Sequence, residues 1–239
     1  MLTMIHSFYN SAVGVKTSQN YLDIVANNIA NVSTDGYKQQ TASFYDLIYT
    51  NMEKAQREDA NIIKGSGSKV EHTGVNWDGG VLIETGSPLH YAINGSGFFM
   101  VRDPATDEET LTRDGNFMLS RQGNGTMYLC TQSGDQVLDS SKRPIVVEEE
   151  GAVLPVGVFH VDNTGGLELC GGNSYRTTDR SGDPVSIDSN AVVQGYIEGS
   201  NVQLSSEMVS MIESQRAYQL NLRMVQTSDE IIQTINNLR

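Results

Sequence analysis

The last 39 residues constrain the fold of this chain more than any other stretch. From Asn201 to Arg239 there is neither Pro nor Gly, and strong helix formers such as Glu207 and Arg216 recur. Steps of alternating four and three residues from Leu204 meet an apolar side chain at seven of ten stops, which is the spacing of one helix face. The stops are Leu204, Met208, Met211, Gln215, Tyr218, Leu222, Val225, Asp229, Ile232 and Asn236. The pattern predicts a helix about 50 Å long with an apolar side that needs a long partner.

The N-terminus supplies a second amphipathic pattern. Steps of three and four residues from Ile5 give a row with one polar stop, a 3.5-residue period that is typical of a left-handed coiled seam. The row is Ile5, Phe8, Ala12, Val15, Gln19, Leu22, Ala26 and Ile29. The turn formers of Asn31–Gly36 then end the helix. Periodicity alone leaves two interpretations open: a helical hairpin that packs on the rest of its own chain, or helices that pack against other copies.

Between the helices the hydrophobic period changes from helical to two. Short apolar runs alternate with Gly, Asn and Asp turns every eight to twelve residues, which is typical of a mainly antiparallel β domain. The sequence T-L-T-R-D-G-N-F-M-L over 110–119 predicts a tight hairpin at Asp114-Gly115. The expected fold class is therefore α+β, with a coiled-coil-like pair of terminal helices and a central β domain. The predicted division is 1–33 for the first helix, 34–68 for a linking segment, 69–197 for the β domain and 198–239 for the second helix.

Charge and composition exclude several functions. A formal net charge of −13 argues against a nucleic-acid partner, which requires clustered basic residues. No apolar run is long enough to cross a bilayer, and Met1–His6 does not resemble the start of a cleaved secretory signal. Cys130 and Cys170 have no metal-ligand spacing, and two separate thiols are expected rather than a disulfide.

The residue patterns of an enzyme are not found. The four histidines are scattered, with no ligand pattern around them. Gly95-Ser96-Gly97 begins like a dinucleotide loop, but Met100 stands where the third Gly belongs. No nucleophile turn and no pair of carboxylates in an apolar setting is found. We therefore expect no enzyme activity, no metal and no cofactor.

Two long motifs carry a family resemblance. Residues 26–38 read A-N-N-I-A-N-V-S-T-D-G-Y-K, which resembles the signature of the bacterial flagellar rod and hook proteins. Residues 198–202, E-G-S-N-V, and the helix that follows them resemble the second signature of that family. Between them, I-N-G-S-G-F-F over 93–99 and L-T-R-D-G-N-F over 111–117 resemble its β-domain motifs. The chain is most similar to the distal rod subfamily, with the proximal rod subfamily next and hook-type subunits lower.

The resemblance implies a structural role. It implies that both terminal helices form the inner layer of a hollow drive shaft that transmits torque and lets export substrates pass, with the β domain facing outward. It also implies export through the flagellar apparatus without a cleaved signal peptide, to the basal body outside the cytoplasmic membrane. The expected partners are other copies, neighbouring rod and hook axial proteins, the export apparatus and surrounding ring proteins. A secreted adhesin with oligomerising terminal helices is the alternative from another class.

The same resemblance suggests where the assembly contacts lie. They are expected on the stops of both helical rows, the polar Gln19 and Gln215 included, and on the amides of Asn27, Asn28 and Asn31, which would bond across subunits. The full set on the first helix is Ile5, Phe8, Ala12, Val15, Gln19, Leu22, Ala26, Asn27, Asn28, Ile29 and Asn31. The set on the second helix is Leu204, Met208, Met211, Gln215, Tyr218, Leu222, Val225 and Ile232. Because a lone helix pair buries little surface, we expect both termini to become ordered among neighbouring copies.

Overall fold

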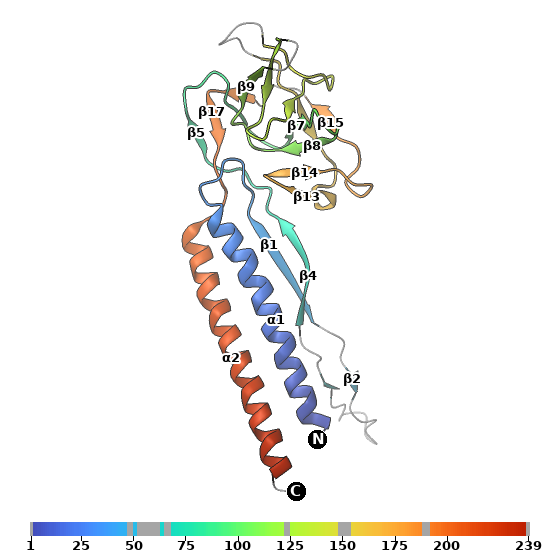
Figure 1. The fold of residues 1–239 in the computed structure, drawn as a ribbon, viewed down its shortest axis with the longest axis vertical. Coiled ribbons are helices and arrows are strands. Elements are labelled where there is room, and N and C mark those ends of the chain that lie inside the picture. Colours follow the sequence, from blue (N-terminus) through green and yellow to red (C-terminus); the bar gives the residue numbers. More distant parts are fainter. Residues whose placement is uncertain are drawn as a thin grey trace. The chain divides into compact units, whose positions relative to one another are not determined.

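The chain forms two compact units (Figure 1). The computed structural model describes residues 2–46, 50–51, 63–64, 68–121, 125–147, 154–187 and 192–237. Unit 1 comprises Met1–Ala30, Gln40–Gly74 and Gln203–Arg239, and unit 2 comprises Asn31–Gln39 and Val75–Val202. Each unit is therefore built from segments that are distant in sequence.

Unit 1 is a helical hairpin with short strands beside it. Helix α1 spans Leu2–Ala30 and helix α2 spans Leu204–Asn237, and the two run side by side in opposite directions (Figure 1). Both chain ends therefore lie at the same end of the hairpin. Strand β1, Gln40–Asp46, pairs with β4, Ser68–Val75, and packs on α1, where the rings of Tyr21 and Phe44 meet edge to face at 5.4 Å. The two predicted terminal helices are confirmed.

The predicted linking segment, 34–68, contributes to both units. Residues 34–39 belong to unit 2, and residues 40–46 form β1 of unit 1. A short pair, β2 at Thr50–Asn51 and β3 at Ile63–Lys64, follows. The remainder of the segment, 47–49, 52–62 and 65–67, lies outside the described residues.

Unit 2 is built on an antiparallel sheet. Nine of the described strands belong to it, in the order β13-β14-β8-β7-β11-β10-β9, with β12 pairing with both β7 and β15. Strand β7 is central because β8 pairs with one of its edges while β11 and β12 share the other. The bounds are β7 Phe98–Arg102, β8 Glu109–Thr112, β9 Met118–Arg121, β10 Met127–Cys130, β11 Gln136–Val137, β12 Val158–His160, β13 Glu168–Gly171, β14 Ser174–Arg176 and β15 Val185–Ile187.

Two small sheets complete unit 2 within the described residues. Strand β6, Tyr91–Ile93, pairs with β16, Val192–Gln194, and strand β5, Leu82–Glu84, pairs with β17, Tyr196–Glu198. A single 3-10 turn, η1, spans Thr164–Gly166. The helix pair and the antiparallel β domain confirm the predicted α+β fold class.

The hairpin predicted at Asp114-Gly115 is wrong. Strand β8 before it pairs with β7 and β14, and strand β9 after it pairs with β10, so the two do not pair with each other. Gly115 serves a different purpose, since a Cβ there would lie 1.6 Å from the carbonyl oxygen of Tyr91. The glycine thus permits a close approach of two backbone segments, which include the hydrogen bond from Tyr91 N to Gly115 O at 3.0 Å.

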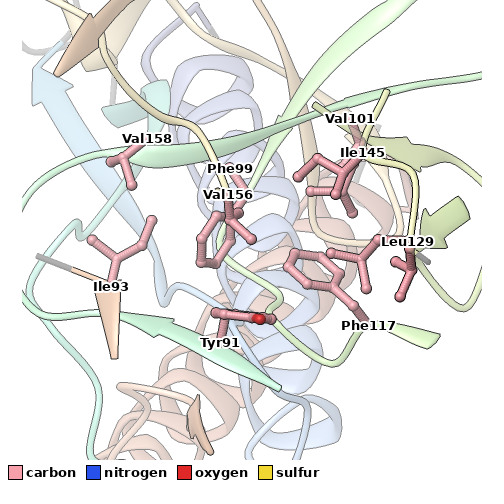
Figure 2. Close-up of a cluster of buried hydrophobic side chains, with 11 residues drawn as sticks. Tyr91, Ile93, Phe99, Val101, Phe117, Leu129, Ile145, Val156 and Val158 are labelled. Carbon is pink, nitrogen blue, oxygen red and sulfur yellow. The ribbon is translucent and has the colours of Figure 1, made fainter. Parts of the chain in front are cut away.

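The main core of unit 2 lies on the face of this sheet to which Phe99 and Val101 of β7 point. Figure 2 shows the rings of Phe99, Phe117 and Tyr91 facing one another among aliphatic side chains, with Phe99 and Phe117 edge to face at 5.2 Å. The aliphatic members are Ile93, Val101, Leu129, Val137, Ile145, Val147, Val156 and Val158. A second cluster includes Phe98, Met100, Leu111 and Tyr175, against which Trp77 packs. Cys130 is buried and Cys170 is exposed, and both are free thiols, as expected.

Neither long helix offers a membrane-spanning segment. Within the part of the chain that the structure describes, no helix combines the length and the apolar character that crossing a bilayer requires.

Candidate assembly surface

The contact between α1 and α2 runs along polar and small residues. The Ser214 hydroxyl donates a hydrogen bond to the Ser18 carbonyl at 3.1 Å, and the Asn28 amide donates to Glu207 at 3.3 Å. Beyond the Ser18–Ser214 contact, toward the chain ends, Gly14 lies so close to Asn221 that a Cβ there would come within 2.8 Å of that side chain. On α2 the inward positions are Glu207, Ser214, Asn221 and Ser228, spaced by seven residues. A seven-residue repeat keeps this seam on one side of a left-handed coil.

The predicted apolar stops whose side chains are described are at most half-buried in the isolated chain. Exposed are Phe8, Ala12, Ala26, Leu204 and Met208, and half-buried are Val15, Leu22, Ile29, Met211, Tyr218, Leu222, Val225 and Ile232. The polar stops Gln19 and Gln215 are exposed, and the side chain of Ile5 lies outside the described residues.

A further apolar row lies on α2, which we name the outer stripe. It consists of Val209, Leu220, Met224, Ile231 and Ile235, each at least 40% exposed, with Leu220 at 62%. The spacings of 11, 4, 7 and 4 residues place all five on one side of the helix. Unit 1 thus pairs its own helices partly through polar groups and leaves the apolar side chains of the outer stripe exposed.

The three asparagines of the first signature have different environments. Asn28 is buried and contacts the start of β1, because its Nδ2 donates to the Gln40 carbonyl at 2.8 Å while the Gln40 amide donates to its Oδ1 at 2.9 Å. Asn27 is exposed, and Asn31 is half-buried and accepts a hydrogen bond from the Thr34 hydroxyl at 3.1 Å. The Asn28 amide thus bonds within its own subunit, and the expected bonds of Asn27, Asn28 and Asn31 across subunits stay a prediction.

Asn28→Ala tests whether the hydrogen bonds of Asn28 stabilise unit 1. The change leaves the backbone groups of Gln40 and one oxygen of Glu207 without their partner, and is expected to destabilise unit 1 by about 1–3 kcal/mol. Asn20→Ala, at an exposed position of the same helix, is the matched control and should have little effect. Hydrogen exchange at the Gln40 amide reports the loss directly. Equal protection of that amide in both variants would contradict the assignment.

Unit 2 contains a buried group of charges that joins both signatures. Glu198, in the second signature, accepts from Lys38 Nζ at 2.6 Å and from Arg113 Nη1 at 3.1 Å. All three side chains are at most 3% exposed. Burial lowers the pKa of the Lys38 ammonium below its ordinary value, and the hydrogen bond to Glu198 opposes this shift. Arg113 also donates to the Gly95 carbonyl at 2.8 Å and lies over the Phe98 ring.

A second carboxylate lies beside the turn of the first signature. Burial, supported by the nearby charge of Asp35, raises the pKa of Asp114 to about 6, and the Asn116 amide that donates to it opposes the rise. Gly36 packs on this segment with a positive φ of 67°, and a Cβ there would lie 2.5 Å from the Asp114 nitrogen. A turn residue of the signature is thus held against the β domain.

The raised pKa of Asp114 predicts that the free energy of unfolding of unit 2 depends on pH. A carboxyl whose folded pKa is above its unfolded value costs stability when ionised, so this cost grows as the pH rises from about 4 to about 6. Asp114→Asn removes the charge and keeps an acceptor for Asn116. It is expected to raise the free energy of unfolding by about 2–3 kcal/mol at about pH 8 and to change it little near pH 4. Urea unfolding of both proteins across this range measures the difference, and a constant difference would contradict the assignment.

Comparisons with known proteins find family-model matches in three parts of the chain and relatives over nearly its whole length. Residues 8–38 match a family model described as flagella basal body rod protein, residues 92–195 match the flagellar hook protein FlgE/F/G D1 domain, and residues 193–238 match the flagellar basal body rod FlgEFG protein C-terminal domain. The flagellar basal-body rod protein FlgG of Buchnera aphidicola subsp. Schizaphis graminum is 32% identical over 265 aligned positions, covering 98% of this chain and 100% of the relative. The chain belongs to the flagellar basal-body rod family.

Other members of the rod family have a similar identity to this chain and cover a similar share of it. FlgG of Bacillus subtilis is 30% identical, covering 99% of this chain and 100% of the relative. The rod protein FlgF of Caulobacter vibrioides is 34% identical over 90% of each chain. The resemblance that the motifs indicated is therefore confirmed.

The sequence reasoning missed several features of this rod-family chain. Val209, Leu220 and Met224 lie outside the predicted row of alternating steps on α2, which follows another side of the helix. A search for apolar residues at any helix-face spacing would have found them. Lys38 and Arg113 both lie inside quoted motifs, but no local pattern indicated that they share Glu198.

Proposed function

We propose that the chain is a structural subunit of the distal part of the flagellar rod, where it assembles with copies of itself into a hollow drive shaft. The supporting observation is the construction of unit 1: its helices contact each other at Glu207, Ser214 and Asn221, and the outer stripe remains exposed. A soluble single subunit normally buries such rows. Contacts with neighbouring copies would cover them.

The assembly surface in this proposal comprises the stops of both helical rows, Gln19 and Gln215 included, and the outer stripe. The amides of Asn27, Asn28 and Asn31 add polar contacts to it. Helices α1 and α2 form the inner layer of the tube, and the acidic β domain of unit 2 faces outward. The partners are other copies and the neighbouring rod and hook axial proteins. The chain reaches this position through the flagellar export apparatus without a cleaved signal peptide, and ring proteins surround it outside the cytoplasmic membrane. Its role is structural and not enzymatic.

A proximal rod position is the second candidate, because the relative FlgF of Caulobacter vibrioides matches as large a fraction of identical residues as the FlgG relatives do. Deleting the gene in the source bacterium and isolating basal bodies tests both positions. A distal subunit predicts short rods without hooks, and gold labelling of a tagged chain in complete basal bodies should mark the rod directly below the hook. Label on the part of the rod nearest the cytoplasmic membrane would favour the proximal position. Complete, hook-bearing rods in the deletion strain would exclude a rod subunit.

A further inference from the structure

The chain leaves unit 2 after Gln39, returns to it at Val75 and leaves it again after Val202. Next to these three points lie residues 36–39, 76–80 and 198–201, and hydrogen bonds inside unit 2 connect every pair of them. We name this connected group the clamp. It is therefore located where force carried along the chain enters and leaves unit 2.

The strongest connection within the clamp joins 36–39 to 198–201. The Gly36 amide donates to the Glu198 carbonyl at 2.6 Å, and the Gln39 amide donates to Asn201 Oδ1 at 2.7 Å. The Lys38 ammonium reaches the Glu198 carboxylate at 2.6 Å. Charge-assisted hydrogen bonds of this kind are roughly twice as strong as neutral ones.

Residues 76–80 are bonded to both of these segments. The side-chain Nδ2 of Asn201 donates to the carbonyls of Asn76 and Asp78, at 2.9 and 3.0 Å. The backbone amide of Gly80 donates to Glu198 Oε1 at 2.8 Å. Lys38 Nζ also donates to the Asp78 carbonyl at 2.7 Å. The backbones are close, since a Cβ on Gly80 would lie 1.9 Å from the Gly199 carbonyl oxygen.

This arrangement provides a short mechanical path through unit 2. A pull on the two chain ends first separates α1 from α2, and then enters unit 2 at Asn31 and at Val202. The bonds between 36–39 and 198–201 carry that pull across directly, so the sheet between them is not loaded until the clamp opens. Several bonds must break together, and one of them is a buried ion pair.

We propose that the clamp is the mechanical anchor of unit 2, which keeps the β domain folded while force passes along the chain. Its biological meaning, torque resistance in a shaft, rests on the proposed function. The clamp itself is a property of the single chain and is tested on the single chain, so a failure of this proposal is distinguishable from a failure of rod assembly.

The experiment holds the full-length chain by its two ends at constant force and measures the lifetime of folded unit 2. Glu198→Gln keeps the shape of the side chain and removes the charge that Lys38 and Arg113 share. We expect the lifetime to fall about 100-fold. Asn201→Ala removes neutral hydrogen bonds of the clamp only, and we expect a fall of about tenfold.

Val137→Ala is the matched control. Val137 is fully buried in the core of the sheet and belongs to no clamp segment, so its truncation lowers the melting temperature without touching the anchor. The proposal predicts that, for an equal loss of melting temperature, the clamp variants lose far more lifetime under force than Val137→Ala. If the loss of lifetime were proportional to the loss of melting temperature, with the same factor in all variants, the clamp proposal would be overturned. Should Glu198→Gln not fold, the comparison of Asn201→Ala with Val137→Ala decides in the same way.

Discussion

Leu220→Glu is expected to abolish assembly of the chain into rods while leaving the folded subunit intact. Leu220 is the most exposed member of the outer stripe at 62%, so a glutamate there meets water in the isolated chain. In the proposed tube the same carboxylate would be buried against apolar neighbours. An unpaired charge in such a position costs several kcal/mol or more. Cells carrying only this variant should have no hooks and should not swim.

Gln219→Glu provides the matched control for this prediction. It adds the same charge one residue earlier, at an exposed polar position of the same helix. We expect rods and swimming to remain normal, and both variants should melt like the parent as purified subunits when followed by circular dichroism. Normal motility of the Leu220→Glu strain would remove the outer stripe from the assembly surface.

The second large effect is expected at Glu198. Glu198→Gln leaves Lys38 and Arg113 buried without a counter-ion, and the free energy of unfolding of unit 2 should fall by about 3–5 kcal/mol. Lys38→Met alone should cost less, because Glu198 keeps Arg113 and the Gly80 amide as partners. In the Glu198→Gln background, however, Lys38→Met removes a buried unpaired cation and is expected to be stabilising.

This reversal of sign is the measurable result. Trp77 is the single tryptophan of the chain and packs against Phe98 and Tyr175 of unit 2, at 5.0 and 4.9 Å between ring centroids. Its fluorescence during urea unfolding therefore reports unit 2, and the four proteins complete a double-mutant cycle. A Lys38→Met effect of equal size and sign in both backgrounds would show that the two charges are not coupled.

The helices and the fold class could be predicted because their cause is local. A row of apolar residues with helical period and no Pro or Gly, as from Leu204 onward, admits few other structures. The resemblance of residues 26–38 and 198–202 to family signatures was equally local. Both kinds of inference depend on residues close together in the sequence.

The side chains by which α1 and α2 meet could not be predicted in this way. Glu207, Ser214 and Asn221 are polar or small, so a search for an apolar seam passes over them. Their spacing of seven is visible only when polar residues are also scored for periodicity. Small size explains only Ser214 and Gly14: Gly14 allows α1 to approach Asn221 of α2 closely.

The errors in unit 2 have a different origin. Asp114-Gly115 has the composition of a tight turn, but Gly115 is required by the nearness of the Tyr91 carbonyl, 24 positions earlier in the sequence. The partners Lys38, Arg113 and Glu198 are likewise far apart along the chain. A single sequence contains no information on such pairings until the fold brings them together.

The antiparallel arrangement of α1 and α2 allows the closure of the helical hairpin to be measured in the free subunit. Since both chain ends lie at the same end of the hairpin (Figure 1), a donor dye on one terminus and an acceptor dye on the other would report hairpin closure by energy transfer in dilute solution. The same labelled subunit, added to growing shafts, would show whether closure precedes docking or follows it. The order of those two events could then be timed molecule by molecule.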